Sequence, residues 1–354
     1  MKFAALFFII AFVVGVFATL NKKGILVTKE TSSPKPQNLL IQTVKLPIEE
    51  RAPSLRGISS WINSGPLSDV DLRGKVVLVD FWTYSCINCI RTIPHLQSWY
   101  KKYKDNGFIL LGVHSPEFDF EKKIENVEAA IKKYSIVYPV ALDSEHETWN
   151  AFGNQYWPAH YLIDVNGNIR YRNFGEGHYA ETEAAIQNLL REARLLTLDK
   201  ITEIKEPPPD TDFRSIGTPE IYLGYLRINN IGNKDANVRP GEPHIFTEPA
   251  EIEQNRFYFI GSWTIGPESS ELTGENGKII LRYKANKVNI VAEARENSEI
   301  PIKIFLDGKL IPETVLVSSP RLYNLIDTVG DANWHTLEIR IPHPGFRIFT
   351  FTFG

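Results

Sequence analysis

The sequence has only two cysteines, Cys86 and Cys89, and it shows no marked excess of charge of either sign. Two cysteines cannot build a disulfide scaffold, so the pair is either catalytic or a single cross-link. A zinc site is not expected, because there is neither a second Cys-x-x-Cys nor a nearby His-x-x-x-His. The formal net charge of −3 gives no sign of nucleic-acid binding. We therefore expect no metal, no other cofactor and no nucleic-acid partner.

The chain is long enough for two domains with hydrophobic cores of their own. Its 354 residues are 43% hydrophobic and 23% charged, as in ordinary globular proteins, and no internal repeat is visible. A proline run at 207–209 forms a stiff spacer, and the hydrophobic pattern changes after it. We predict an α/β domain at 51–198, a proline-rich linker at 199–215 and an all-β domain at 216–354.

The first 20 residues contain an almost continuous apolar segment, from Phe3 to Leu20, after a single Lys2. One interpretation is a signal peptide cut after Ala18, where small residues suit a signal peptidase. The other is an apolar helix that stays as a single-span membrane anchor, since about eighteen apolar residues can just cross a bilayer. Both interpretations place the rest of the chain outside the cytoplasm, in the periplasm or at the cell surface, with residues 21–50 as a tether.

Strand and helix patterns alternate in the first predicted domain. In the predicted helices apolar residues step by three and four, and Asn166-Gly167 predicts a tight hairpin. The alternation predicts an α/β fold with a central mixed sheet. The predicted strands are 75–81, 108–114, 138–142, 160–164 and 169–171, and the predicted helices are 86–104, 119–134, 145–152 and 179–196.

Beyond the linker, apolar residues recur with a period of two, and no helical pattern interrupts them. Asn276-Gly277 and Asp307-Gly308 are hairpin turn signals. Many short strands joined by such turns predict a β-sandwich or jelly roll. The predicted strands are 221–228, 257–263, 277–283, 288–294, 302–306, 315–317, 323–327, 335–341 and 347–353.

The Cys86-Ile87-Asn88-Cys89 motif lies where a predicted buried strand gives way to a predicted helix. Unpaired N–H groups and the helix dipole at a helix start stabilise a thiolate. Cys86 is therefore the candidate nucleophile, and Cys89, one turn inside the helix, is the candidate resolving cysteine. The alternative is an inert disulfide, which would add little stability because it closes so short a loop.

The residues around this pair resemble those of the thioredoxin superfamily. Asp80-Phe81-Trp82 precedes the Cys-x-x-Cys, Pro94 follows Cys89 by five residues, and Trp157-Pro158 lies in a segment similar to the one that carries the family's cis-proline. The insert between Phe108 and Leu142 resembles the TlpA/redoxin variation. More narrowly, five segments resemble the soluble C-terminal part of DipZ-type proteins: Trp82–Arg91, Tyr156–Ala159, Gly175–Tyr179, Thr218–Leu226 and Phe351–Gly354.

This resemblance implies roles for residues next to the dithiol. Asp80 would be a buried acid that relays a proton to or from Cys89 as a mixed disulfide is resolved. Pro158 would follow a cis peptide bond and shield the dithiol. A surface or capping role for Asp80 and an ordinary trans turn at Pro158 are the alternatives.

The resemblance also implies a substrate groove next to Cys86. Trp82, Tyr84 and Trp157 would line it, with Trp82 packed beside the dithiol, and a core position for each ring is the alternative. The remaining histidines, His160 among them, are scattered through the sequence, and we expect surface or core roles for them.

The function implied by the resemblance is that of an extracytoplasmic thiol–disulfide oxidoreductase that reduces disulfides in client proteins. Electrons would arrive from a membrane transporter such as a CcdA-like partner. DipZ-type proteins carry that transporter fused in front, whereas we expect at most one span here and therefore a separate electron donor.

Two other functions stay open. Thr83-x-x-Cys86 matches the T-x-x-C of peroxiredoxins and would suit a thiol peroxidase, although Val79 stands where that family has proline. The predicted β domain resembles carbohydrate-binding modules, so the chain could also be an adhesion or sugar-binding protein with a degenerate thioredoxin domain.

Overall fold

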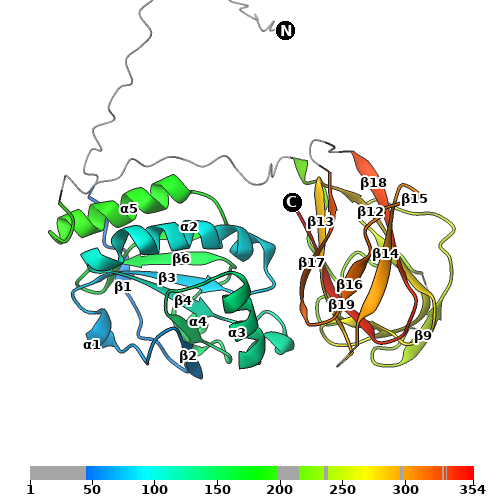
Figure 1. Cartoon of the computed structure of the whole chain (residues 1–354), viewed down its shortest axis with the longest axis horizontal. Helices are drawn as coiled ribbons and strands as arrows, with labels where there is room; N and C mark the ends of the chain where they lie inside the picture. The colour runs from blue at the N-terminus through cyan, green and yellow to red at the C-terminus, as the bar shows by residue number, and fades with distance from the viewer. Residues whose placement is uncertain (1–44, 198–214, 235–237, 296–297, 329–330, 332) are drawn as a thin grey trace, which may run out of the picture. The chain divides into compact units, whose positions relative to one another are not determined.

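The computed structural model of the chain describes residues 45–197 and 215–354, apart from 235–237, 296–297, 329–330 and 332 (Figure 1). The predicted N-terminal apolar helix lies outside the described residues, as do most of the tether and the proline-rich linker. Within the described ranges, no helix combines the length and the apolar character that a bilayer span requires.

The first domain is built on a seven-stranded mixed sheet with the order β1-β7-β6-β3-β4-β5-β2. The β3–β4 and β4–β5 pairs are parallel and the other pairs are antiparallel, which confirms the predicted α/β fold. The strands are β1 (Glu50–Arg51), β2 (Ser60–Ile62), β3 (Val76–Trp82), β4 (Phe108–His114), β5 (Val140–Leu142), β6 (Ala159–Ile163) and β7 (Asn168–Phe174). The helices are α1 (Asp69–Leu72), α2 (Ile87–Tyr103), α3 (Ile124–Lys133), α4 (Glu147–Ala151) and α5 (Tyr179–Glu192), with 3-10 helices η1 (Lys104–Asn106) and η2 (Asp119–Lys122).

The central strand β3 is buried along its whole length, and its side chains alternate between two apolar cores. The even-numbered apolar side chains pack with residues of α2, α3 and α5, and the odd-numbered ones pack with residues of α4. Helices α2 and α5 lie next to each other along one face of the sheet (Figure 1). By this alternation Asp80 belongs to the face that α2 covers.

Two predicted helices are shorter than the sequence pattern indicated. The predicted helix at 119–134 is divided into η2 and α3, because the backbone of Lys123 is extended between them. The predicted helix at 179–196 ends at Glu192, and Arg194 then adopts a left-handed backbone conformation. Strand β2 and helix α1 were not predicted, since the sequence at 58–72 is only weakly patterned.

All the strand pairs described for the second domain are antiparallel, which confirms the predicted all-β class. The short strands β9, β11 and β15 were not predicted, and the predicted strand at 221–228 ends at Tyr222. The strands are β8 (Ile221–Tyr222), β9 (Pro243–Phe246), β10 (Phe257–Ile265), β11 (Ser270–Leu272), β12 (Gly277–Lys284), β13 (Lys287–Ala294), β14 (Ile300–Leu306), β15 (Lys309–Leu310), β16 (Val315–Val317), β17 (Arg321–Asp327), β18 (Trp334–Ile341) and β19 (Phe346–Phe353).

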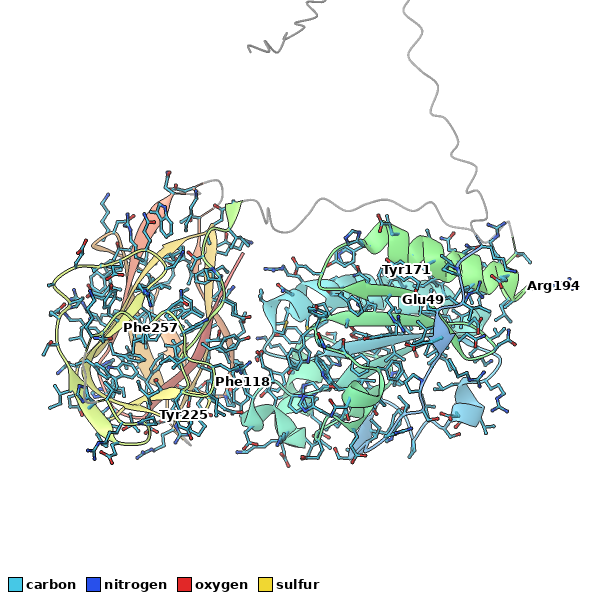
Figure 2. All side chains as sticks on the ribbon, turned by 180° about the vertical axis from the view of Figure 1, so that it is seen from behind. Glu49, Phe118, Tyr171, Arg194, Tyr225 and Phe257 are labelled. Atoms are coloured by element: carbon cyan, nitrogen blue, oxygen red, sulfur yellow. The ribbon has the colours of Figure 1, made fainter. Side chains whose placement is uncertain are left out.

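Strand β10 connects two parts of this antiparallel sheet by changing partners midway. Residues 257–260 pair with β12, whereas residues 261–265 pair with β9 and β11. The change occurs at Gly261, whose φ of +96° is a conformation that favours glycine. Phe257 (Figure 2) and Trp263, from the two halves of β10, are both fully buried in one apolar core. A jelly-roll topology within this all-antiparallel domain stays a prediction.

The two hairpin signals of this domain have different outcomes. Asp307-Gly308 forms the predicted two-residue hairpin, because Leu306 and Lys309 are partners in the β14–β15 ladder. The prediction for Asn276-Gly277 is wrong, since the strands that it joins, β11 and β12, do not pair with each other.

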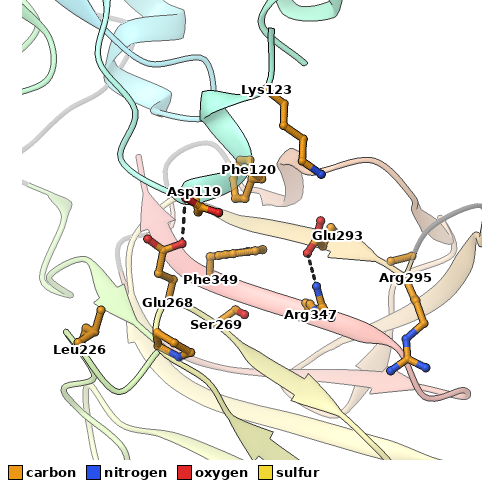
Figure 3. A pocket seen from close by; sticks show the side chains of 12 residues that line it. Asp119, Phe120, Lys123, Leu226, Glu268, Ser269, Glu293, Arg295, Arg347 and Phe349 are labelled. Atoms are coloured by element: carbon orange, nitrogen blue, oxygen red, sulfur yellow. Dashed lines mark hydrogen bonds and ion pairs between the residues drawn. The ribbon is translucent and has the colours of Figure 1, made fainter. Parts of the chain in front are cut away.

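Ion pairs link β19 to its neighbours in the sheet. Arg347 binds Glu293 of β13 at 3.1 Å (Figure 3) and Glu271 of β11 at 2.8 Å. Since Arg347 is partly exposed to solvent, each pair adds modestly to stability, and the buried apolar face of β19 contributes more.

Gly224 gives a test of packing in the β domain. A Cβ atom at this position would lie 2.1 Å from the backbone carbon of Glu268, so Gly224→Ala should destabilise this domain by more than about 2 kcal/mol. We expect faster amide hydrogen exchange in β8, β10 and β11, measured by mass spectrometry, with unchanged protection at 45–197. Gly65→Ala is the control, since nothing lies within 4 Å of its Cβ position. Equal protection in the two variants would contradict the packing described.

Candidate active site

Cys86 caps the N-terminus of α2. Its backbone is extended (φ −75°, ψ 118°), and its Sγ accepts a hydrogen bond from the backbone N–H of Cys89 at 3.5 Å. This geometry arises because β3 ends at Trp82 and a three-residue turn leads directly into the helix. The Cys86 sulfur therefore lies at the positive end of the α2 dipole, an arrangement that stabilises negative charge on it.

Cys89 differs from Cys86 in its exposure to solvent. The Cys89 side chain is buried in the first turn of α2, with only 2% of its surface exposed, whereas Cys86 is partly exposed. Burial raises the pKa of the Cys89 thiol well above its ordinary value, and Cys86 and Asp80 raise it further. Both cysteines are free thiols, so the pair has an accessible first sulfur and a shielded, protonated second one.

Asp80 lies in the core below α2, as the resemblance to thioredoxins implied. It is 1% exposed, and its Oδ1 lies 3.3 Å from Nε2 of His160, which is fully buried. Asp80 and His160 are partners in the antiparallel β3–β6 ladder, so their side chains project from the same face of the sheet. His160 was expected to have only a surface or core role, because the β3–β6 register that brings it to Asp80 cannot be derived from the sequence.

The Trp157–Pro158 peptide bond is cis, as the resemblance implied. The carbonyl oxygen of Trp157 lies 3.9 Å from Sγ of Cys86, close enough for a weak S–H hydrogen bond. The Trp157 ring is held in place by an Nε1 hydrogen bond to the Ser115 carbonyl at 2.9 Å and by packing on Trp149 at 4.3 Å. Trp157 and Cys86 both line one cavity.

Trp82 and Tyr84 do not line this cavity, and the prediction that they form part of a groove is wrong for both. Trp82 is 1% exposed and Tyr84 is 3% exposed. Both rings pack against the buried His114 ring, Trp82 in a T-shaped arrangement and Tyr84 stacked. Trp82 follows the even-numbered alternation of β3 into the core, and Tyr84, in the turn after β3, packs into the same core, so neither ring is accessible.

Glu121 is a buried acid that the sequence analysis missed. It belongs to η2, and its Oε1 accepts hydrogen bonds from Ser85 Oγ at 2.7 Å and Ser85 N at 3.3 Å. Its Oε2 accepts from the backbone N–H groups of Glu117 and Phe118. Burial raises the pKa of Glu121 to about 7, although the hydroxyls of Thr83 and Ser85 act in the opposite direction. The carboxyl group thus holds the turn that carries Cys86.

His114, at the end of β4, is a second buried group near this turn. Burial lowers the pKa of its imidazole to about 3, so the ring is neutral at ordinary pH. Its Nε2 lies 3.4 Å from the hydroxyl of Thr83, which is also fully buried. In the part of the chain that the structure describes, no three His, Cys, Asp or Glu side chains are arranged to hold a metal ion.

Comparison with known proteins shows which families the two domains resemble. The model of the AhpC/TSA family matches residues 48–172, and the model described as a thioredoxin like C-terminal domain matches residues 218–354. The DipZ proteins of Mycobacterium bovis and Mycobacterium tuberculosis are each 37% identical to this chain over 310 residues, which is 86% of the chain and 43% of DipZ. Thiol-disulfide oxidoreductase YkuV of Bacillus subtilis is 26% identical over 145 residues, which is 41% of this chain and 97% of YkuV.

The chain thus spans less than half the length of the DipZ proteins that it matches. It contains the Cys86–Cys89 pair in a thioredoxin-like domain, and its relatives include a thiol–disulfide oxidoreductase by name. The chain is a DipZ homologue, with a thioredoxin-like domain of the AhpC/TSA type followed by a thioredoxin-like C-terminal domain.

Proposed function

We propose that this protein reduces disulfide bonds in client proteins outside the cytoplasm. The observation that carries the proposal is the difference between its two thiols. Cys86 is accessible and receives an N–H hydrogen bond at the start of α2, whereas Cys89 is buried and its pKa is raised. This difference suits a nucleophile and a resolving cysteine.

The reaction begins when the Cys86 thiolate attacks one sulfur of a client disulfide. A Cys86–client disulfide forms, and the other client sulfur leaves as a thiolate and takes a proton from solvent. Cys89 then loses its proton and attacks Sγ of Cys86, which forms the Cys86–Cys89 disulfide and releases the second client thiol. The client gains two electrons and the protein dithiol loses two. The Trp157 carbonyl next to Cys86 is positioned to accept a hydrogen bond from the client backbone.

The proposed location rests on the apolar N-terminal segment, which lies outside the described residues. The proposed electron donor rests on the similarity to DipZ proteins. A signal peptide or anchor at 3–20 would place both domains in the periplasm or at the cell surface. We infer a CcdA-like membrane protein as the electron donor. We also propose that the all-β domain at 216–354 docks or spaces the redox domain, with carbohydrate contact as the alternative.

A thiol peroxidase is a second candidate, because Thr83-x-x-Cys86 and the AhpC/TSA match both favour it. In this reaction Cys86 would attack peroxide, with the Thr83 hydroxyl polarising it. Against it, Thr83 is fully buried, and its hydroxyl faces His114. Peroxide consumption by the reduced protein without reduction of insulin disulfides would favour the peroxidase.

The exchange mechanism predicts that Cys89→Ser traps client proteins. The variant keeps the Cys86 nucleophile but cannot complete the second step, so covalent Cys86–client complexes should accumulate and disappear on addition of reductant. Non-reducing gels and mass spectrometry of cells expressing the variant measure these complexes. The matched control, Cys86→Ser, should trap none and should have no insulin reductase activity. Equal trapping by both variants would contradict the assigned roles.

The buried Glu121 predicts a specific pH dependence of stability. Its pKa is raised from 4.5 to about 7, so the folded state binds this proton more tightly than the unfolded state. The stabilisation is complete below pH about 4.5 and is lost as the pH rises to about 7. Glu121→Gln removes this dependence, so the difference in unfolding free energy between variant and wild type should change by up to about 3 kcal/mol over this interval.

Urea unfolding at a series of pH values measures this difference, and the change with pH separates proton binding from any constant cost of lost hydrogen bonds. Glu128→Gln is the control, because Glu128 is exposed on α3. A constant difference between Glu121→Gln and wild type at all pH values would contradict the assignment.

A further inference from the structure

None of the residue roles described above uses the contact between Asp80 and His160. Asp80 of β3 has His160 of β6 as its partner on one side and Gly112 of β4 on the other. Gly112 has no side chain, so the space beside Asp80 on that side is filled by Trp82 and Tyr138, which lie 3.0 and 3.2 Å from the position of a Gly112 Cβ. His160 is therefore the ladder partner that presents a polar side chain to Asp80.

The contact with Asp80 is the one polar contact that the structure describes for the His160 ring. Within the described ranges, neither ring nitrogen of His160 has a hydrogen-bond partner of good geometry, and Nε2 lies 3.3 Å from Asp80 Oδ1. The edge of Trp99 from α2 packs against the ring, with 6.3 Å between the centroids. A histidine without access to water and without another acceptor depends on Asp80 for its polar interaction.

Burial makes the two groups depend on each other. Both are cut off from water, and a buried polar group without a partner is unfavourable. The His160 ring nitrogen, 3.3 Å from Asp80 Oδ1, can donate a hydrogen bond that fixes the orientation of the carboxyl group.

We propose that His160 is a positioning residue that keeps Asp80 able to accept the proton of Cys89 during resolution of the mixed disulfide. The inference rests on the proposed exchange function. A hydrogen bond from His160 Nε2 holds the Asp80 carboxylate in place, and this carboxylate takes the proton from the Cys89 thiol. The Cys89 thiolate attacks Sγ of Cys86, the bond between Cys86 and the client sulfur breaks, and the client leaves as a thiolate. That thiolate takes a proton from Asp80 or solvent, so protons and electrons balance.

Among the described residues, Cys89 of α2 and Tyr138, which precedes β5, are the titratable groups whose pKa Asp80 shifts. Burial raises the pKa of Tyr138 well above its ordinary value, and Asp80 and Cys89 add to this, so the phenol stays neutral. Of the groups named, His160 is the one described within hydrogen-bonding distance of Asp80.

The test follows the two steps of the reaction separately with Ellman's reagent, a chromophoric disulfide. Attack by Cys86 releases one coloured thiolate, and resolution by Cys89 releases the second, so stopped-flow absorbance gives both rates. His160→Leu, which removes the N–H donor, should leave the first rate unchanged and slow the second about tenfold at pH 7. The defect should shrink as the pH rises, because hydroxide then removes the Cys89 proton without help from Asp80.

The matched control is Tyr161→Phe, which removes a buried hydroxyl from the next position of β6 on the opposite face, where it contacts Asn154. It should leave both rates and their pH profiles unchanged. Unchanged resolution in His160→Leu, or a defect of equal size at every pH, would overturn the inference and leave the exchange function intact. Failure of the wild-type protein to release the first thiolate would overturn both.

Discussion

The hydrogen bond from the Cys89 N–H to the Cys86 sulfur is the interaction on which the account of this site depends. It exists because a fully buried strand, β3, ends just before a helix, and a short turn places Cys86 at the helix cap. Both cysteines of the sequence lie at this one junction. A thiol at any other place on the sheet or helix would lack both the dipole and the free N–H groups.

Burial then makes the two thiols unlike each other. The same helix that exposes Cys86 at its cap carries Cys89 into the core one turn later. Two buried acids lie near the dithiol, Asp80 in the sheet below α2 and Glu121 in the 3-10 helix bonded to the turn. Glu121 accepts hydrogen bonds from the Ser85 hydroxyl and from three backbone N–H groups, whereas the polar contact described for Asp80 is the His160 ring at 3.3 Å.

Much of the fold followed from local sequence patterns. The apolar run of β3, the helical spacing of α2 and the Asp307-Gly308 hairpin were all predicted, because short-range sterics and burial determine them. The Asn276-Gly277 turn was mispredicted because strand pairing in the β domain depends on residues far apart in sequence.

The residues of the site also fall into two groups, those that sequence motifs predict and those that depend on contacts between residues far apart in sequence. Cys86, Cys89 and the cis bond before Pro158 could be expected from motifs. The places of His160 and Glu121 could not, since they depend on the β3–β6 register and on a hydrogen bond that Ser85 donates to Glu121, 36 residues away. Trp82 and Tyr84 were placed in the groove because closeness in sequence to a reactive cysteine gives no information about which face of the sheet a ring occupies.

The most direct measurement is the rate at which iodoacetamide alkylates each sulfur of the reduced protein at neutral pH, resolved by tandem mass spectrometry. The account predicts that Cys86 is modified at least about tenfold faster than Cys89, since only the first sulfur is both accessible and stabilised as a thiolate. Slow modification of Cys86, or faster modification of Cys89, would contradict it.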